Sequence, residues 1–429
     1  MMPPCKPKFC FESTLHYSSP AHGDWGIVQI GMMVPESYQL FVCPSACGRH
    51  AAIGAMQHGL KDRLSFLYVD QSDIIAGYDS LIADAVDELF RALSPWKPRV
   101  MLIFVSCLDD LIGTDHEALM SRLSEAHPGV LFRDCHMNPI SLDSDSPPGV
   151  TLQKRIYSLL EADPEGRRDR AVNCVGNFEA IDPKSELHGL LGRLGCEARH
   201  ISQYKRFDDF QAMARGELNL VIGPGALPAA RQMEPELGIP FVFLPVSYRL
   251  EQIGRNYETL LAALGHADEA PRDFAFLGQR EERAKAKIAE ALAAAGDVPI
   301  VVDNSAVVKP FELARALVEY GFRVERVVTG DCPEIDREAF EWLQENAPDV
   351  RIIQPEHHNS VRFADRLEES LAIGLDGAYV TGSKYLLDMI DDSGMYGYCG
   401  VETLMGRIID AVSREADLKA VIDSYGLVV

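Results

Sequence analysis

Short apolar runs alternate with amphipathic stretches along the chain, and the clearest run extends from Val100 to Ser106. Its six consecutive apolar residues are too few for a stable helix and are rich in β-formers, which predicts a parallel strand buried on both faces. The same alternation begins near residue 38. In this first unit we expect strands at 38–42, 64–69, 100–106 and 130–133, and helices at 49–59, 78–93, 115–126 and 151–161.

The alternation of strand and helix then occurs twice more. The second unit has predicted strands at 170–175, 197–201, 218–222 and 240–244, and the third at 298–303, 322–328, 350–353 and 377–381, before a last long helix at 401–413. Strands that alternate with helices form parallel sheets covered by helices. The expected fold class is therefore α/β, with three Rossmann-like doubly wound parallel-sheet units. The predicted domains are an N-terminal Rossmann-like domain at 1–162, a second at 163–285 and a third at 286–429.

Cysteines stand at two of the predicted strand ends. Cys107 directly follows the strand at 100–106, and Cys43 and Cys47 belong to a predicted tight turn after the first strand. Thr114, with Glu117 three residues later, has the pattern of a capping box and predicts a helix start behind Cys107. Ligands bind at the carboxyl ends of the strands in open α/β sheets, and a nearby helix start favours a thiolate. We therefore expect one site that draws on both strand ends.

The chain is acidic, with 41 Lys and Arg residues against 64 Asp and Glu and a formal net charge of −23. It has no basic stripe that could neutralise phosphates, so we expect no binding to nucleic acid or to an anionic membrane surface. No apolar stretch approaches the length of a spanning helix, and the expected location is cytoplasmic. Ten cysteines are too sparse for a disulfide scaffold, which leaves metal binding or burial for each of them.

A nucleotide site is the first alternative to a metal site. Gly223-Pro-Gly225 follows a predicted strand, as a dinucleotide-binding loop would. That fingerprint needs a third glycine where this chain has Pro228, and the sequence contains no phosphate loop of the Walker type. The preferred interpretation is a strand-to-helix turn.

A zinc site is the second alternative. The spacing Cys43-x3-Cys47-x2-His50 offers ligand types for zinc but lacks a second pair. Cys135-His136 does not readily supply that pair, because adjacent residues in an extended stretch point to opposite faces. His357-His358 also follows a predicted strand, where a polar loop over the sheet is the simpler interpretation.

Two cysteine motifs resemble those of the nitrogenase component 1 superfamily: Cys47-Gly-Arg-His, and Ser106-Cys107-Leu-Asp-Asp-Leu-Ile-Gly-Thr-Asp. Weaker motifs follow in the same order over nearly the whole chain, at 173–178, 218–223, 237–241 and 395–401. In that superfamily three cysteines per chain hold half of a large iron-sulfur cluster at a subunit interface. The resemblance implies Cys10, Cys47 and Cys107 as ligands of an [8Fe-7S] cluster of the P-cluster type. The spacing from Cys10 to Cys47 is longer than in nitrogenase proper, so Cys43 stays open as the first ligand.

The resemblance also implies a place in a larger complex. In catalytic α chains a cofactor-anchoring cysteine and a late histidine occupy positions where this chain has Gly223 and Tyr396. The chain is therefore similar to a β-type subunit. The residues of its two cysteine motifs resemble those of the methylthio-alkane reductases, which cleave carbon-sulfur bonds reductively. The implied partners are an α-type subunit, in a heterotetramer, and an ATP-hydrolysing iron-sulfur reductase homodimer. A cofactor-assembly scaffold and the cofactor-bearing α-type subunit are the alternatives.

Overall fold

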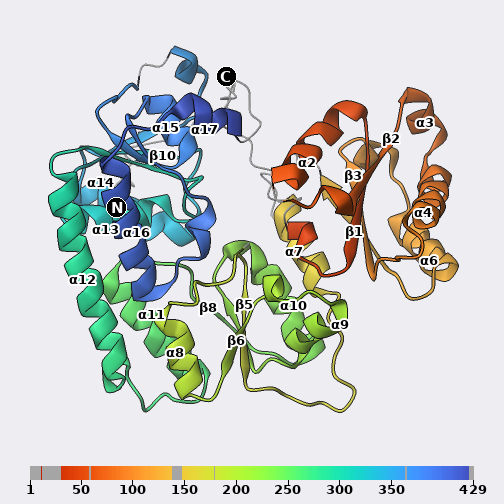
Figure 1. The fold of residues 1–429 in the computed structure, drawn as a ribbon, viewed down its shortest axis with the longest axis horizontal. Coiled ribbons are helices and arrows are strands. Elements are labelled where there is room, and N and C mark those ends of the chain that lie inside the picture. The colour runs from red at the N-terminus through yellow and green to blue at the C-terminus, as the bar shows by residue number, and fades with distance from the viewer. Residues whose placement is uncertain are drawn as a thin grey trace, which may run out of the picture. The chain divides into compact units, whose positions relative to one another are not determined.

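The computed structural model describes residues 11, 30–57, 59–137, 147–177, 179–362 and 365–424. Contacts divide the chain into two compact units. The two-sheet unit comprises residues 24–180 and 196–243, and the one-sheet unit comprises residues 1–23, 181–195 and 244–429. The three parallel sheets confirm the predicted α/β fold class with Rossmann-like units (Figure 1). The predicted domain boundaries stay a prediction.

The first sheet of the two-sheet unit has the strand order β2-β1-β3-β4, with all pairs parallel. Every residue of β3 is buried, as predicted. Met101, Ile103 and Val105 pack on the side of α4 and α6, while Leu102 and Phe104 pack on the side of α2 and α7 (Figure 1). The elements are β1 (Ser37–Cys43), α2 (Ser45–Gln57), β2 (Leu64–Tyr68), α3 (Gln71–Ala76), α4 (Asp79–Leu93), β3 (Val100–Ser106), α5 (Asp109–Ile112), α6 (His116–Ala126), β4 (Leu131–Met137) and α7 (Pro148–Tyr157).

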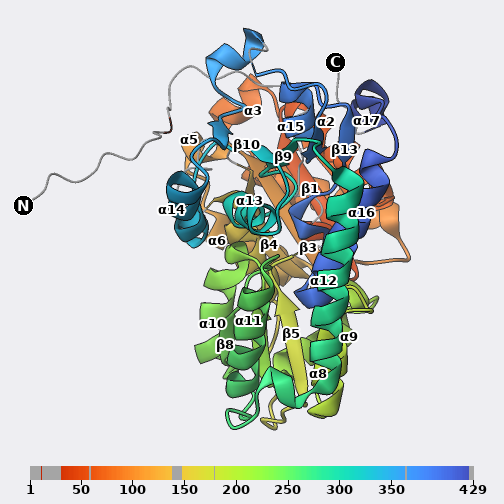
Figure 2. The ribbon, with the colours of Figure 1, turned by 90° about the vertical axis from the view of Figure 1, so that its left-hand side faces the viewer.

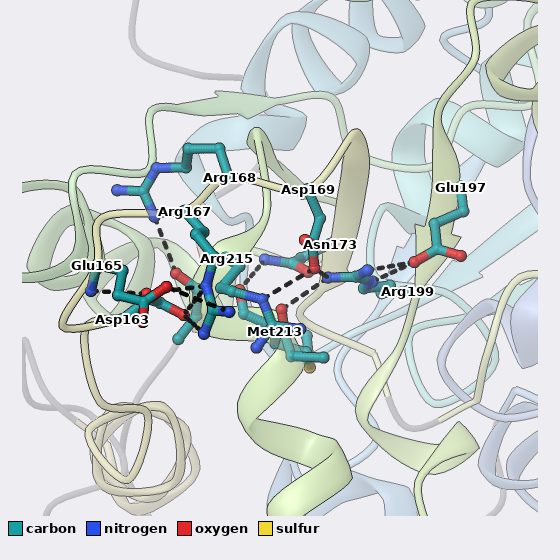
Figure 3. Close-up of polar contacts among 12 residues, drawn as sticks. Asp163, Glu165, Arg167, Arg168, Asp169, Asn173, Glu197, Arg199, Met213 and Arg215 are labelled. Carbon is teal, nitrogen blue, oxygen red and sulfur yellow. Dashed lines mark hydrogen bonds and ion pairs between the residues drawn. The ribbon is translucent and has the colours of Figure 1, made fainter.

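The second sheet repeats this order as β6-β5-β7-β8, again parallel. Ion pairs fix the chain that leads into it: Asp169 accepts from Arg199 at 2.8 Å and from Arg215 at 3.2 Å (Figure 3). Inside the sheet, Asn173 donates to Asn219 at 2.9 Å. The elements are β5 (Ala171–Val175), β6 (Glu197–Arg199), α9 (Phe207–Phe210), β7 (Leu218–Val221), α10 (Leu227–Leu237) and β8 (Phe241–Phe243).

The one-sheet unit holds a five-stranded parallel sheet in the order β11-β10-β9-β12-β13. Two of its long helices, α12 and α16, lie side by side in both views (Figure 1, Figure 2). The elements are α8 (Glu186–Arg193), α11 (Leu250–Ala263), α12 (Ala275–Ala295), β9 (Ile300–Asp303), α13 (Pro310–Glu319), β10 (Val324–Val328), α14 (Arg337–Asn346), β11 (Arg351–Ile353), β12 (Leu371–Ile373), α15 (Leu375–Thr381), β13 (Tyr385–Leu387), α16 (Gly397–Val412) and α17 (Leu418–Ser424).

One predicted strand is wrong. Residues 377–381 form part of helix α15, and the strand lies earlier, at Leu371–Ile373. The buried Asp303 carboxylate accepts a hydrogen bond from the Gly377 N–H, one of the first-turn amides that a helix leaves unpaired. This distant partner stabilises a helix start in a segment whose Tyr-Val-Thr composition favours a strand.

Helix α16 begins four residues before its predicted start. The Glu186 carboxylate accepts from the N–H groups of Tyr398 and Cys399, at 2.5 and 3.0 Å, and from the Tyr257 hydroxyl at 2.7 Å. A buried acid therefore caps this helix from more than 200 residues away. Of the described helices, none combines the length and the apolar character needed to cross a membrane.

Candidate functional site

Three cysteines converge at the carboxyl edge of the first sheet. Strands β1 and β3 are parallel neighbours, with Val42 opposite Val105, so both chains leave the sheet at the same edge. Cys43 is the last residue of β1, and Cys107 follows the last residue of β3. Cys47 lies in the first turn of α2, not in the predicted turn ahead of the helix, because α2 begins at Ser45 directly after Pro44.

The three thiols differ in exposure but influence one another. Cys43 is fully buried, whereas Cys47 and Cys107 are partly exposed. Burial, followed by the charge of Cys47, raises the pKa of Cys43 to about 12. Burial and then the neighbouring Cys107 raise the pKa of Cys47. Thiols that lie close together are expected to raise one another's pKa. A bound metal ion has the opposite effect, because it displaces the thiol protons.

Close packing of α2 on β2 positions Cys47. A Cβ on Gly48 would lie 2.9 Å from a Phe66 ring carbon and 3.1 Å from a Tyr68 ring carbon. Glycine therefore lets the first turn of α2 rest on two stacked aromatic rings, whose centroids are 5.6 Å apart. Tyr68, the last residue of β2, pairs with Cys43 and is 54% exposed. An exposed aromatic side chain therefore borders the cysteines.

The turn after Cys107 is fixed by hydrogen bonds to Asp109. The Asp109 carboxylate accepts from the hydroxyls of Tyr78 at 2.5 Å and Thr114 at 2.8 Å, and contacts Nε2 of His116. Burial alone would raise the pKa of Asp109, but the three hydrogen bonds outweigh it and lower this pKa. The predicted capping box is wrong, because Thr114 bonds to Asp109 while Asp115 caps α6 by accepting from the Ala118 N–H.

The structure adds a group of polar side chains that sequence reasoning missed. Asp109, His116 and His136 come together with potential ligand atoms all within 4.8 Å of one another. Asp109 and His116 belong to the segment behind Cys107, but His136 was considered only together with Cys135. Register supplies the missing signal: β4 lies beside β3, with His136 opposite Val105, two residues before Cys107.

In the described part of the second sheet, glycines follow the two central strands at the carboxyl edge. Gly176 follows β5 with a φ of +105°, and Gly223 follows β7. The two residues touch, since a Cβ on Gly223 would lie 1.8 Å from the carbonyl oxygen of Gly176. Gly223-Pro-Gly225 lies between the end of β7 at Val221 and the start of α10 at Leu227, which confirms the strand-to-helix interpretation.

The remaining predicted residues fall into three groups. Cys10 lies outside the described residues, as does the side chain of His50, so their ligand roles stay predictions. Cys135 is buried in the hydrophobic core while His136 contacts His116, so the two point apart as predicted. The rings of His357 and His358 face each other at 4.2 Å, and neither joins a group of three metal-ligand side chains in the described part of the chain.

Comparison with known proteins identifies the family of the chain. The profile of the nitrogenase component 1 type oxidoreductase family matches residues 26–412. The chain belongs to this family. The solved structure of nitrogenase Cp1 at pH 6.5 has a TM-score of 0.73 at 17% identity and covers 95% of each chain. A second structure, nitrogenase Cp1 at pH 5, has a TM-score of 0.62 at 14% identity and covers 90% of this chain and 87% of the other.

Two relatives are named as cofactor biosynthesis proteins. The nitrogenase iron-molybdenum cofactor biosynthesis protein NifE of Sinorhizobium fredii is 24% identical over 57% of this chain. NifE of Mesorhizobium japonicum is 23% identical over 67% of it. The matched segments span 51% and 58% of these relatives, so the chain covers little more than half of their length. The solved structures thus show the fold, and the family profile shows membership.

Proposed function

We propose that this chain is the β-type subunit of a nitrogenase-like reductase and holds half of an [8Fe-7S] cluster of the P-cluster type. The observation that carries the proposal is the convergence of Cys43, Cys47 and Cys107 at one sheet edge. Thiolates are the ligands of iron-sulfur clusters, so the donor set fits iron. Cys47 and Cys107 are the assigned ligands, with Cys10 as the third and Cys43 as its alternative. Such a cluster, when bound, would pass electrons between proteins.

A facing subunit is part of the proposal. Three cysteines are too few for a cluster of this size, so an α-type chain would supply the others. Cys47 and Cys107 are partly exposed, and the half-exposed Tyr68 borders them. An exposed aromatic residue beside open ligands suits an interface that excludes water on assembly. The proposed assembly is a heterotetramer with two copies of each chain.

The second sheet argues against a resident active-site cofactor in this chain. Gly223 occupies the position at which the catalytic α chains of the resembled superfamily have a cofactor-anchoring cysteine. Its contact with Gly176 leaves no room for a side chain. We therefore assign the reducing site to the α-type partner. Electrons would come from an ATP-hydrolysing iron-sulfur reductase homodimer, and the proposed reaction is reductive cleavage of carbon-sulfur bonds in methylthio-alkanes. The residues around Cys47 and Cys107, which resemble the motifs of the methylthio-alkane reductases, support this substrate class.

The test is anaerobic co-expression of this chain with its α-type partner, followed by iron and sulfide analysis and electron paramagnetic resonance. We expect a heterotetramer with a cluster signal and methylthio-alkane reduction that requires both the reductase and ATP. This chain alone should reduce no substrate. A homodimer of this chain that reduced substrate with only the reductase added would overturn the subunit assignment.

A second candidate function is a cofactor-assembly scaffold, and the similarity to NifE supports it. A scaffold releases its metal cargo to another protein, whereas a reductase subunit keeps its cluster. Iron is therefore counted in the purified complex before and after many turnovers, with an apo-acceptor protein present. Iron that stays with the complex supports the reductase subunit, and stoichiometric transfer to the acceptor supports the scaffold.

A further inference from the structure

Asp109, His116 and His136 reach a common point from three elements of the first sheet. Asp109 begins α5, His116 begins α6 and His136 lies in β4. The two imidazole rings meet edge to face, with centroids 5.0 Å apart and an interplanar angle of 78°. Nε2 of His116 contacts Oδ2 of Asp109. Among the described side chains, these form the one group of three His, Cys, Asp or Glu residues whose ligand atoms converge in this way.

We propose that Asp109, His116 and His136 bind one divalent transition-metal cation of the Zn²⁺ or Fe²⁺ class. Two imidazoles and one carboxylate are a donor set for these ions in catalytic and non-haem sites, with one or more positions left to water. The thiols of Cys47 and Cys107 form a softer, separate donor set. The proposal does not rest on the cluster assignment, because it uses none of the cysteines.

The neighbours of Asp109 are arranged as those of a metal ligand would be. Tyr78 and Thr114 both donate to Oδ1, which leaves Oδ2 to face the histidine. The Asp109 side chain is 2% exposed, and buried carboxylates are held by paired charges or by metal ions. Hydrogen bonds that fix one carboxylate oxygen orient the other toward a metal and contribute strongly to affinity.

His116 supplies an independent sign that an ion belongs here. Its Nδ1 atom is buried and has no hydrogen-bond partner in the structure. Buried polar atoms in folded proteins rarely lack a partner, and Nδ1 is one of the two atoms through which histidine binds metals. Neutral imidazole is the form that binds metals. The side chain of His136 is 32% exposed, against 14% for His116, so the open side of the site lies at His136 and gives an ion a path from solvent.

Charges on β4 complete the surroundings. Asp134, two residues before His136 on the same strand, lies 3.5 Å from its Nε2. Arg155 pairs with Asp134 at 2.8 Å and so neutralises it. Of the three proposed ligands, Asp109 alone is an acid and supplies the negative charge that faces the ion. A bound cation would connect the turn behind Cys107 to the start of α6 and to β4.

The test uses the full chain with Cys47→Ser and Cys107→Ser as a common background, which removes the two partly exposed thiols at this sheet edge. The metal-free protein is titrated with Co²⁺, followed by absorbance, and then with Zn²⁺ in competition. We expect one ion per chain. His116→Gln and His136→Gln should each weaken binding by more than about 100-fold, and Tyr78→Phe by about 10-fold, as for loss of an outer-shell partner. His127→Gln is the matched control, since His127 directly follows the same helix and pairs with Asp87 at 3.0 Å.

Two results would overturn the proposal. One is a background protein that binds neither ion at millimolar concentration, and the other is binding that both histidine substitutions leave unchanged. If the substitutions prevent folding, as judged by circular dichroism, the background protein is treated with diethyl pyrocarbonate with and without Zn²⁺. Selective protection of His116 and His136, but not of His266, would support the site, and equal modification in both conditions would exclude it.

Discussion

The first and second sheets have the same strand order but carry different chemistry at their carboxyl edges. In the first sheet, Cys43 is the last residue of the central strand β1, and Cys107 directly follows the central strand β3. In the second, Gly176 directly follows β5 and Gly223 lies two residues after β7, and the backbones of the two glycines touch. The first edge presents partly exposed thiols, and the second is closed by its own main chain.

Topology therefore fixes where a site can form, while the residues at the strand ends decide whether one does. Neighbouring parallel strands always bring two chain exits together. Where the residues after the two strands have ligand-binding side chains, a site can form. Where they are glycines, the two loops can pack against each other. The one-sheet unit shows a third arrangement, in which β9 ends at Asp303, a buried carboxylate packed against Gly374 and Gly377.

The largest expected effect comes from removing a thiol at the first edge. Cys107→Ala should abolish most iron binding and electron transfer, while unfolding free energy falls by only about 1 to 2 kcal/mol, as for a small truncation. Cys135→Ala is the matched control, because Cys135 is buried in the core beneath the same sheet. It should lose similar stability but keep its iron. Iron analysis and urea unfolding of both variants check this, and full iron content in the Cys107 variant would contradict it.

The next effect comes from adding a side chain at the second edge. Gly223→Ala places a Cβ 1.8 Å from the Gly176 carbonyl oxygen, and both partners are backbone, so neither can yield cheaply. We expect a loss of about 3 kcal/mol or more in unfolding free energy. Gly149→Ala, in α7 of the same unit, meets nothing closer than 4.0 Å and should be neutral or stabilising by under about 1 kcal/mol. Equal unfolding midpoints for the two variants would disprove the contact.

At the carboxyl edge of the five-stranded sheet, Asp303 should make the unfolding free energy depend on pH. Burial, followed by the charge of Asp376, raises the pKa of Asp303 to about 6. A raised carboxyl pKa means that the folded protein holds the proton more tightly. The stabilising contribution is therefore complete below about pH 4 and is lost as pH rises to about 6.

Asp303→Asn should remove this dependence. The difference in unfolding free energy between the variant and the wild type should move in the variant's favour by roughly 3 kcal/mol between pH 4 and pH 8, since each pKa unit corresponds to about 1.4 kcal/mol. Asp297→Asn, at an exposed position before the same strand, is the control and should follow the wild-type profile. Chemical unfolding at several pH values measures both. Parallel profiles for Asp303→Asn and the wild type would show that this carboxyl does not titrate as described.

Periodicity predicted the fold better than it predicted the site. Buried strands such as β3 are short runs of apolar, β-forming residues, so three parallel sheets could be predicted, although the run at 377–381 belongs to a helix. Cys47 and Cys107 could be singled out because strand ends are where ligands bind. What could not be predicted depends on distant partners: Glu186 extends α16, and the Gly377 amide finds its acceptor on Asp303, 74 residues earlier. Local sequence carries no record of such contacts.

The same limit explains the capping error and gives the smallest prediction. The turn after β3 is held by side chains, among them the Thr114 hydroxyl on Asp109, whereas the turn after β7 is held by backbone contact. Thr114→Ala should cost about 1 to 2 kcal/mol, because it removes a hydrogen bond to a buried charged group. A capping residue would lose a similar amount, so stability alone does not separate the two roles.

The proposed metal site does separate them. If Thr114 orients Asp109, Thr114→Ala should also weaken Co²⁺ binding by about 10-fold, as loss of an outer-shell hydrogen bond does. Ser124→Ala, in the same α6 helix, removes an exposed hydroxyl that donates to the Met120 carbonyl at 2.8 Å. It should change stability by under about 0.5 kcal/mol and leave Co²⁺ affinity unchanged. A Thr114 variant that lost stability but kept full Co²⁺ affinity would show that this residue only stabilises the turn. The comparison between the two turns would then rest on Tyr78 alone.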